Sequence, residues 1–426
     1  MRRFSRGGAD WSHLPDKVAI QLNDTHPTLA VPELMRIRLD EAQLGWDVAW
    51  DLTRRTLAYT NHTLLPEALE KWPLHYFQQM LRDSLKSSTR STSAFSTTCG
   101  TAIPAMRAAS RRQPDRGGAR GQSPYGKSGD RRFVQYQRRR RDPFQAAGET
   151  TVRDLAEIFR ERFNNKTNGV TPRRWLFLAN PGLARVIAGA IGDDWITDFD
   201  RIAEFKPAGE DAAFRNSFLQ AKRDAKSLFA NWLQATSGQT VDPDSIVDCQ
   251  TKRIHEYKRQ MLNALRVIVL YNRLRANPDL DLAPCTFFFA GKAAPAYHLA
   301  KLIIKFVNNL AGTIDGDPAI RGRIKVVFLP EYCVSLAERL IPAAGVSNQI
   351  STAGFEASGT SNMKFMMNGA LTVGARDGAT IEMAQEAGEE NFYLFGLTAQ
   401  EVADSRGWYD PPGTMRASPR HVTPSI

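Results

Sequence analysis

The chain has 426 residues, of which 42% are hydrophobic, so it is long enough for two or three globular domains with their own cores. Its net charge of +11 is concentrated, because residues 85–149 hold fourteen basic and four acidic side chains, against 42 and 41 elsewhere. The composition excludes a wholly disordered protein. The four cysteines lack metal or disulfide spacing, so we expect no metal site. With no membrane-spanning run and no signal-peptide core, we expect a cytoplasmic protein.

The first predicted elements lie within residues 1–83. Residues 17–22 (KVAIQL) form a short apolar run that predicts a strand, and residues 32–42 and 46–72 have the spacing and capping residues of helices. The pattern changes after Asp83, because residues 84–149 are rich in Ser, Thr, Arg, Gly and Pro and show no periodicity. We therefore expect a folded domain at 1–83, followed by an aberrant, disordered segment at 84–149.

Residues 150–410 alternate predicted helices and strands. Helices are expected at 150–163 and 254–276, and strands at 286–291, 324–330 and 370–378. A further helix follows the first of these strands, and its expected inner face consists of Leu299, Leu302, Ile303, Phe306 and Leu310. The alternation predicts an α/β domain with a doubly wound, Rossmann-like parallel sheet that binds ligands at the carboxyl ends of its strands. Residues 411–426 show no packing pattern and are expected to form an aberrant tail.

One candidate site lies in EASGTSNMKFMMNGAL, residues 356–371. Its small residues would present backbone N–H groups to an anion where a helix begins. Lys364 follows one turn later among apolar side chains, a setting that lowers a lysine pKa and suits imine formation. Taken alone, the pattern fits an exposed helical lysine after a glycine turn better than it fits a site.

A second candidate is CQTKRIHEYKRQ, residues 249–260. It concentrates four cations, and we expect Arg253 and Lys258 to lie on neighbouring turns of a helix. Cations that converge in this way would bind inorganic phosphate or a phosphoryl group. Basic runs are more often solvated helix faces, so the residues alone leave both interpretations open.

Several motifs in order resemble those of the α-glucan phosphorylases that act on glycogen, starch or maltodextrin. Besides the two stretches above, the similar segments are VAIQLNDTHPTLAVPELMR, AYTNHTLLPEALEKWP, NNKTNGVTPRRW, AGKAAPAYHLAK, QISTAGFEASGT and AGEENFYLFG. The resemblance covers most of 7–83 and 150–398. It implies a B-type glycosyltransferase fold in which residues 1–83 are the C-terminal remnant of the first, glucan-binding domain. The second domain, residues 150–410, would also be incomplete and would bind pyridoxal 5′-phosphate through a lysine. The resemblance further implies retaining cleavage of terminal α-1,4-glucosyl units by inorganic phosphate to give glucose 1-phosphate.

The resemblance also assigns roles to individual residues. Lys364 would hold the cofactor as an imine. The cofactor phosphate would be contacted by Thr360, Ser361 and Lys252, with Tyr332 nearby. The substrate phosphate would be bound by Arg253 and Lys258, which with Lys252 form the expected catalytic cations. The glucosyl unit would be contacted by Asn168, Glu356, Ser358 and Gly359, with His26 at the catalytic cleft. Family members are usually homodimers, but the sequence leaves the oligomeric state of this chain open.

The sequence departs from the family between residues 84 and 149. There the family has a helix of the type HLQVIYEINRRFL and a glucose-contacting segment of the type GSHSTNGVAAIHS. Synonymous codons for residues 85–99, read in another frame, give QVIYEINVRFLDDV, and those for residues 135–144 give STNGVAAIH. We therefore interpret 84–149 as translated out of frame, and the chain as a fragment, truncated at both ends, that folds poorly and has little or no phosphorylase activity.

Two other function classes remain as alternatives. A nucleic-acid-binding protein would use 85–149 as a basic arm, but the frame-shift hypothesis removes the charge on which that interpretation depends, so no nucleic-acid partner is expected. A nucleotide-sugar glycosyltransferase of the same fold would share the doubly wound domain. It would have no use for Lys364 as an imine-forming residue, so covalent capture of the cofactor distinguishes the two enzymes.

Overall fold

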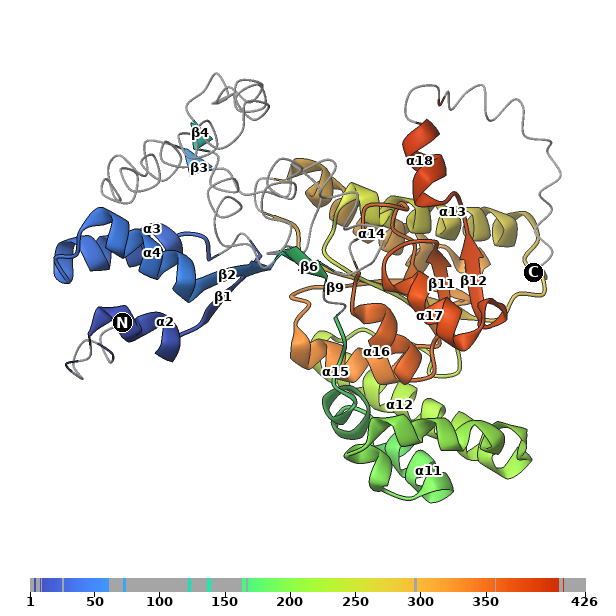
Figure 1. The fold of residues 1–426 in the computed structure, drawn as a ribbon. Helices are drawn as coiled ribbons and strands as arrows, with labels where there is room; N and C mark the ends of the chain where they lie inside the picture. The colour runs from blue at the N-terminus through green and yellow to red at the C-terminus, as the bar shows by residue number, and fades with distance from the viewer. Residues whose placement is uncertain are drawn as a thin grey trace. The chain divides into compact units, whose positions relative to one another are not determined.

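The structure, a computed structural model, describes residues 10–24, 27–60, 168–294, 297–356 and 358–405, with isolated positions and short strands outside these ranges (Figure 1). The chain divides into two compact units, Met1–Thr167 and Asn168–Ile426, which are described separately. The domain limits expected from the sequence, at 83, 149 and 410, stay predictions. The helix expected at 150–163 lies outside the described residues up to Phe163, where a short strand begins.

The first unit contains a two-stranded parallel sheet covered by helices. Its elements are η1 (Trp11–His13), α2 (Leu14–Lys17), β1 (Ile20–Asn23), α3 (Ala30–Arg36), the π-helix η2 (Ile37–Glu41), α4 (Trp46–Thr56) and β2 (Leu57–Thr60). Strands β1 and β2 pair in parallel, whereas β3 (Trp72–Pro73) pairs antiparallel with β4 (Gln122–Ser123), and β5 (Tyr136–Arg138) pairs in parallel with β6 (Phe163–Asn165). Strands β4 and β5 fall within the segment 84–149, whose other residues lie outside the described ranges.

Two sequence predictions for this unit need correction. The strand expected at 17–22 begins only at Ile20, because residues up to Lys17 close the helix α2. The helix expected over 46–72 ends at Thr56, and the chain continues as strand β2. In β2 the buried side chains of Leu57 and Tyr59 pack into the same core as Leu22 of β1, so pairing and burial outweigh the helical pattern. Residues 61–71 lie outside the described part of the chain.

The second unit is built on a six-stranded parallel sheet. A doubly wound parallel sheet is confirmed, although the sequence predicted only three of its strands. Its strands are β7 (Ile246–Thr251), β8 (Cys285–Ala290), β9 (Ile324–Leu329), β10 (Val346–Gln349), β11 (Leu371–Ala375) and β12 (Phe392–Phe395). Their order across the sheet is β12-β11-β10-β7-β8-β9, and every neighbouring pair is parallel. The chain therefore winds outward from β7 in one direction and, after β9, from β10 in the other, which is the doubly wound topology.

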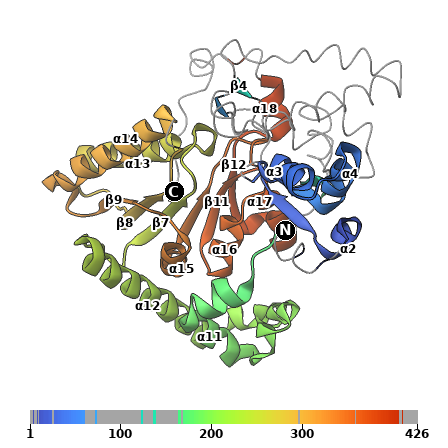
Figure 2. The ribbon, with the colours of Figure 1, turned by 90° about the vertical axis from the view of Figure 1, so that its left-hand side faces the viewer.

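Helices cover both faces of this sheet (Figure 2). The α-helices are α11 (Pro181–Ile191), α12 (Ala212–Ser237), α13 (Gln260–Ala276), α14 (His298–Asp315), α15 (Val334–Ala343), α16 (Ser361–Met367), α17 (Ala379–Ala387) and α18 (Ala399–Ser405). The other helical segments are the π-helix η5 (Arg173–Leu178) and the 3-10 helices η6 (Asp194–Ile196), η7 (Phe199–Glu210), η8 (Glu256–Lys258), η9 (Pro318–Ile320) and η10 (Glu389–Asn391). Among the helices of the described ranges, none combines the length and apolar character that crossing a membrane requires.

Strand β8 shows how the sheet separates two cores. Its three consecutive phenylalanines, Phe287, Phe288 and Phe289, are each 1% exposed. Phe288 packs with residues of α12 and α15, whereas Phe287 and Phe289 pack with residues of α13 and α14. Because successive side chains of a strand point to opposite faces, one apolar run fills both cores, as a parallel sheet covered on both sides requires.

The helices flanking β8 differ from the sequence prediction in two ways. The helix expected at 254–276 begins only at Gln260, because Arg259 adopts the left-handed conformation (φ 56°) and residues Glu256–Lys258 form the separate turn η8. The predicted inner face of α14 is rotated. Ile303 and Leu310 are buried as expected, but Leu299 and Leu302 are 47% and 45% exposed, and the buried face is completed by Ala300, Val307 and Ile314.

Candidate active site

The candidate site lies where the sheet reverses its winding, between β7 and β10. In doubly wound sheets the crevice at the carboxyl ends of two such strands is the usual ligand site. Lys252 directly follows β7, and its backbone N–H donates to Ala290 at the end of β8 (2.9 Å). The next residue of that loop is Gly291, where a Cβ would lie 1.9 Å from the carbonyl oxygen of Lys252. Only glycine lets the two strand ends approach this closely.

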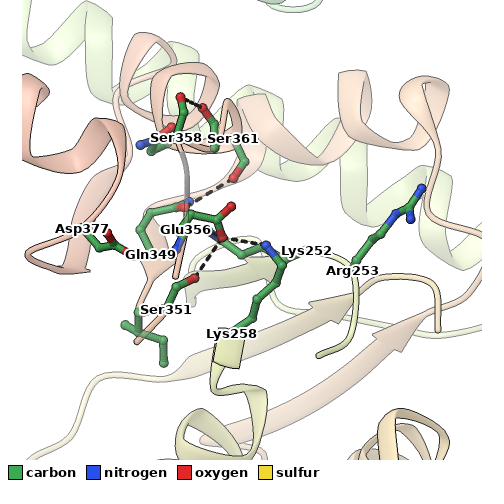
Figure 3. A network of polar contacts seen from close by, with 12 residues as sticks. Lys252, Arg253, Lys258, Gln349, Ser351, Glu356, Ser358, Ser361 and Asp377 are labelled. Atoms are coloured by element: carbon green, nitrogen blue, oxygen red, sulfur yellow. Dashed lines mark hydrogen bonds and ion pairs between the residues drawn. The ribbon is translucent and has the colours of Figure 1, made fainter. Parts of the chain in front are cut away.

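Glu356 is the centre of a charged network at this crevice (Figure 3). Its Oε2 accepts a hydrogen bond from Nζ of Lys258 (2.6 Å) and another from Oγ of Ser351 (3.1 Å), and it lies 3.5 Å from Nζ of Lys252. The side chains of Lys252, Lys258 and Glu356 are only 7%, 13% and 15% exposed. Two buried ammonium groups therefore share one carboxylate oxygen.

Opposing effects set the pKa values in this network. Burial favours the neutral carboxyl of Glu356, but the charges of Lys252 and Lys258 and the hydrogen bonds from Lys258 and Ser351 outweigh it and lower the pKa of Glu356 to about 2. Burial lowers the pKa of Lys252, and the neighbouring carboxylate of Glu356 opposes that shift. Glu356 is therefore fully ionised near neutral pH, and it is the counter-ion that allows two lysines to be buried here.

Asp377 lies behind Glu356, at the carboxyl end of strand β11. Its Oδ2 accepts a hydrogen bond from the backbone N–H of Glu356 (2.7 Å). Burial raises the pKa of Asp377 to about 6, although hydrogen bonds from the backbone of Glu356, Gly354 and Gly378 oppose the shift. A small polar cavity is lined by Asp377, Glu356, Lys252, Ser351 and Ser358, among other residues. The network therefore borders a space in which a polar group can be held.

The start of helix α16 meets the same strand ends. Gly359 adopts a positive φ (74°), Thr360 is the N-cap residue of α16, and Oγ of Ser361 donates to Oε1 of Gln349, the last residue of β10 (3.4 Å). Ser358 is buried, and its hydroxyl donates to the carbonyl of Gly359 (2.9 Å). The predicted glycine turn is thus present, and it joins α16 to the carboxyl end of β10.

Lys364 lies in the middle of α16 and faces an aromatic ring. Its Nζ is 3.8 Å from the ring centroid of Trp175, which belongs to η5. Burial, with a smaller effect from the charge of Arg174, lowers the pKa of Lys364. The ammonium group over the indole ring has a favourable cation–π contact, and no ion pair to Lys364 is found among the residues that the structure describes. Burial makes proton loss, which imine formation requires, easier at Lys364 than at an ordinary exposed lysine.

Tyr332 connects a third segment to the end of β7. It follows β9 in the chain, and its hydroxyl donates to Oγ1 of Thr251, the last residue of β7 (3.2 Å). Burial raises the pKa of Tyr332, so the phenol stays protonated and remains a donor. The segments after β7, β9 and β10 therefore all contribute a predicted site residue to one end of the sheet.

The structure thus brings some of the predicted site residues together and separates others. Lys252, Lys258 and Glu356 meet directly. Arg253 is exposed, and its side chain points away from the network in Figure 3. The expectation that Arg253 and Lys258 lie on neighbouring helical turns is wrong, because the helix starts after both. Asn168 is half-buried at the first residue of the second unit, and His26 lies outside the described residues.

Sequence reasoning missed three residues that the geometry places at the site: Ser351, Asp377 and Trp175. Signals for them were present. Asp377 follows a predicted strand, at the end where ligands of such sheets bind, and Ser351 lies in the stretch QISTAGFEASGT. Trp175 ends the stretch NNKTNGVTPRRW, where neither charge nor spacing distinguishes it from a core tryptophan. The roles predicted for individual site residues stay predictions.

Comparisons with known proteins agree with the resemblance seen in the sequence. The model of the family described as "Phosphorylase: Carbohydrate phosphorylase" matches residues 1–112 and 145–422. The muscle forms of glycogen phosphorylase from Mus musculus and Homo sapiens are each 47% identical to this chain over 406 residues. The brain form from Bos taurus is 45% identical over 407 residues. Each alignment covers 92% of this chain and 47% of the relative, so the chain spans about half the length of these curated relatives.

The residues between the two matched ranges, 113–144, lie inside the segment that we interpret as out of frame. The matched ranges reach into that segment from both sides, up to residue 112 and from residue 145. The second range also reaches into the expected aberrant tail, to residue 422. The frame-shift hypothesis therefore stays a prediction about the coding sequence.

Proposed function

This chain belongs to the carbohydrate phosphorylase family, and from that premise we propose that its second unit carries the cofactor and phosphate sites of an α-1,4-glucan phosphorylase. The reaction would be phosphorolysis of terminal α-1,4-glucosyl units to glucose 1-phosphate with retained configuration. Its substrates would be a cytoplasmic glucan and inorganic phosphate.

The observation that carries the proposal is the presence of two kinds of lysine environment at one end of the sheet. Lys252 and Lys258 are ion-paired with Glu356, whereas Lys364 is half-buried against an aromatic ring. Phosphate recognition requires the first kind, and covalent bonding to an aldehyde requires the second. A nucleotide-sugar transferase would need no lysine of the second kind.

These residues fit pyridoxal 5′-phosphate. Lys364 would bond its aldehyde, and the indole of Trp175 offers a flat apolar surface beside that lysine. Thr360, Ser361 and Lys252 would bind its phosphate, and Tyr332 stays protonated near the same strand end. When bound, the group would supply a phosphate that exchanges a proton with the substrate phosphate during cleavage of the glycosidic bond.

The chain's own residues would orient and stabilise the substrates. Lys258, with the exposed Arg253, would bind the incoming phosphate. Glu356 holds the ammonium group of Lys258 in place, and its backbone N–H is fixed by Asp377. Glu356, Ser358, Gly359 and Asn168 would contact the glucosyl unit. The cations would offset the negative charge of two adjacent phosphates while positive charge develops on the sugar ring.

Covalent capture tests the cofactor assignment. The full chain is incubated with pyridoxal 5′-phosphate, reduced with borohydride and digested, and the modified lysine is located by mass spectrometry. We expect the label on Lys364, and its loss in Lys364→Met. Lys226→Met, which removes a lysine from α12, is the matched control. Its Lys364 should be labelled as fully as in the unsubstituted chain. Label spread over many lysines, or equal labelling of Lys364→Met, would contradict the proposal.

We further propose that the chain as written releases little or no glucose 1-phosphate. Residues 84–149 lack the glucose-contacting segment that the family resemblance requires. The test has two parts: an assay of glucose 1-phosphate release by the purified chain, and the nucleotide sequence encoding 84–149. Robust release would overturn the expectation of low activity, and an interval free of one- or two-base insertions and deletions relative to intact relatives would overturn the frame-shift hypothesis.

A further inference from the structure

We propose that Asn368 is a positioning residue that holds Lys364 over the ring of Trp175, and that Lys222 anchors Asn368 from behind. The inference rests on the proposed function, in which Lys364 bonds the cofactor. Both residues lie outside the Glu356 network, and neither would touch the cofactor or the substrate under the roles proposed above. Their effect would be transmitted through the backbone of α16 and η5.

The side-chain amide of Asn368 joins the two partners of the Lys364 contact. Asn368 directly follows α16 and is fully buried. Its Nδ2 donates to the backbone carbonyl of Trp175 (2.7 Å) and to that of Lys364 (2.9 Å). An amide nitrogen carries two protons, so each carbonyl receives one. A single planar group therefore sets the spacing between the backbone that carries the ring and the backbone that carries the ammonium.

The carbonyl of Trp175 can accept this bond because the hydrogen-bond pattern of η5 changes there. The N–H of Ala179 donates to Arg174 (3.1 Å), five residues back, whereas the N–H of Asn180 donates to Leu176 (2.9 Å), four residues back. Neither of these two N–H groups donates to the carbonyl of Trp175, which lies between the two acceptors in the sequence. A π-type turn inside a helix releases a carbonyl in this way, and Asn368 supplies the donor.

The orientation of the Asn368 amide is fixed by a neighbouring asparagine. Oδ1 of Asn180 accepts from the backbone N–H of Leu183 (3.2 Å) and so caps helix α11. The Nδ2 of Asn180 then donates to Oδ1 of Asn368 (3.0 Å). Since that oxygen is the acceptor, the Nδ2 of Asn368 has to face the two carbonyls. The donor role of Asn368 is therefore built into the fold.

Lys222 of α12 fixes the backbone of Asn368. Its Nζ donates to the carbonyls of Asn368 (2.8 Å), Pro342 (2.8 Å) and Ala344 (2.7 Å). The three protons of an ammonium group match these three acceptors. The end of α16 is thus joined to the end of α15 through a buried side chain. Lys226, one turn along α12, donates instead to the carbonyl of Ser245 (2.9 Å) and provides the matched control.

The test measures the pKa of the Lys364 amine without the cofactor, and the capture of the cofactor by that amine when it is added. Asn368→Asp keeps the shape of the side chain, replaces its two donors by a carboxylate oxygen and repels both carbonyls. Competitive labelling with acetic anhydride across pH, quantified on the Lys364 peptide, reports the pKa and accessibility of that amine in the cofactor-free chain. We expect the profile of Lys364 to shift toward that of an ordinary exposed lysine. We also expect borohydride trapping of pyridoxal phosphate to fall on the order of tenfold.

Lys222→Met should produce a smaller shift in the same direction, and Lys226→Met should produce none. If near-ultraviolet circular dichroism shows that Asn368→Asp does not fold, Asn368→Ser is tested in its place. The serine hydroxyl keeps one donor, so the labelling profile of Lys364 should lie between that of the unsubstituted chain and that of an ordinary exposed lysine. An unchanged Lys364 profile in a folded Asn368 variant would overturn the inference. If the profile shifts as expected but the unsubstituted chain traps no cofactor on Lys364, the positioning role stands and the proposed function fails.

Discussion

The Glu356 network and the Lys364 contact bury lysines at the same end of one sheet by opposite means. Lys252 and Lys258 share one carboxylate, an ion-paired arrangement that removes three charged groups from water. Lys364 instead faces an indole ring, and the backbone that carries it is held by neutral amides. Burial lowers the pKa of both Lys252 and Lys364, so the two environments differ in the partner offered to the ammonium group, a carboxylate in one and an aromatic ring in the other.

Removal of the carboxylate at Glu356 should have the largest effect. Glu356→Ala leaves two buried ammonium groups without a counter-ion, so we expect the free energy of unfolding to fall by about 3–5 kcal/mol. Urea denaturation of the full chain measures it. Glu389→Ala is the matched control, because Glu389 pairs with Arg376 at 2.8 Å but is 60% exposed, so that change should have a much smaller effect. Equal losses would mean that Glu356 is not the counter-ion on which the burial depends.

The pH dependence of stability should show two opposite slopes. The pKa of Asp377 is raised to about 6, so its protonation as pH falls from 6 toward 4 favours the folded state by about 3 kcal/mol. The pKa of Glu356 is lowered to about 2, so its contribution, also about 3 kcal/mol, is present above pH 4.5 and is lost as pH falls toward 2. Denaturation at a series of pH values should therefore give a maximum near pH 4–5.

Two substitutions show which carboxyl group causes each slope. Asp377→Asn should remove the rise between pH 6 and 4 and keep the acid loss. Glu356→Gln should remove the acid loss and keep the rise. A pH profile that neither substitution changes would show that other carboxylates control the acid stability of the chain.

Replacement of the ring should affect Lys364 alone. In Trp175→Leu the amine of Lys364 gains access to water, so its pKa should rise toward the ordinary lysine value, and cofactor trapping near neutral pH should fall. Competitive labelling of the Lys364 peptide measures the shift. Glu356→Gln, tested alongside, should leave that peptide unchanged. A shift in both variants would show that the environment of Lys364 and the Glu356 network are coupled and not independent.

The smallest effect is expected for Arg253. This side chain is exposed and points away from Glu356, so Arg253→Gln should change the free energy of unfolding by no more than about 0.5 kcal/mol. Urea denaturation is the measurement. A loss of several kcal/mol would place Arg253 within the buried network in solution.

The sequence allowed prediction of three of the six strands in the sheet of the second unit. Strands β8, β9 and β11 were predicted, whereas β7 (IVDCQT), β10 (VSNQ) and β12 (FYLF) were missed. Strand β12 is apolar but only four residues long, whereas β7 and β10 carry buried polar side chains. Polar side chains of β7 and β10 are buried with hydrogen-bond partners on neighbouring elements. Nδ2 of Asn348 in β10 donates to Oδ1 of Asp248 in β7 (2.5 Å), and Gln250 of β7 accepts from Asn263 of helix α13 (3.0 Å). Burial of polar groups in such pairs depends on which elements are neighbours, and a one-dimensional pattern does not contain that information.

The candidate site shows the same limit. The family resemblance indicated Lys252, Lys258, Glu356 and Lys364, but their partners follow from three-dimensional proximity. Trp175 and Asn368 lie 193 residues apart in the sequence, and they meet because α16 packs against η5. The solvated-face interpretation of Lys252 and Lys258 is wrong, because both side chains are at least 87% buried.

The winding order of the sheet also has a consequence for folding kinetics. Lys258 and Glu356 are separated by 98 residues, and the strands that precede them, β7 and β10, are neighbours in the sheet although β8, β9 and their helices lie between them in the sequence. Closing so long a loop is entropically costly, and the contact that rewards it is the β7–β10 pairing. We expect amide protons of β10 to gain protection from hydrogen exchange later during refolding than those of β8. Until β7 and β10 pair, the ammonium groups of Lys252 and Lys258 remain hydrated. The Glu356 network would therefore be among the last parts of the unit from which water is excluded.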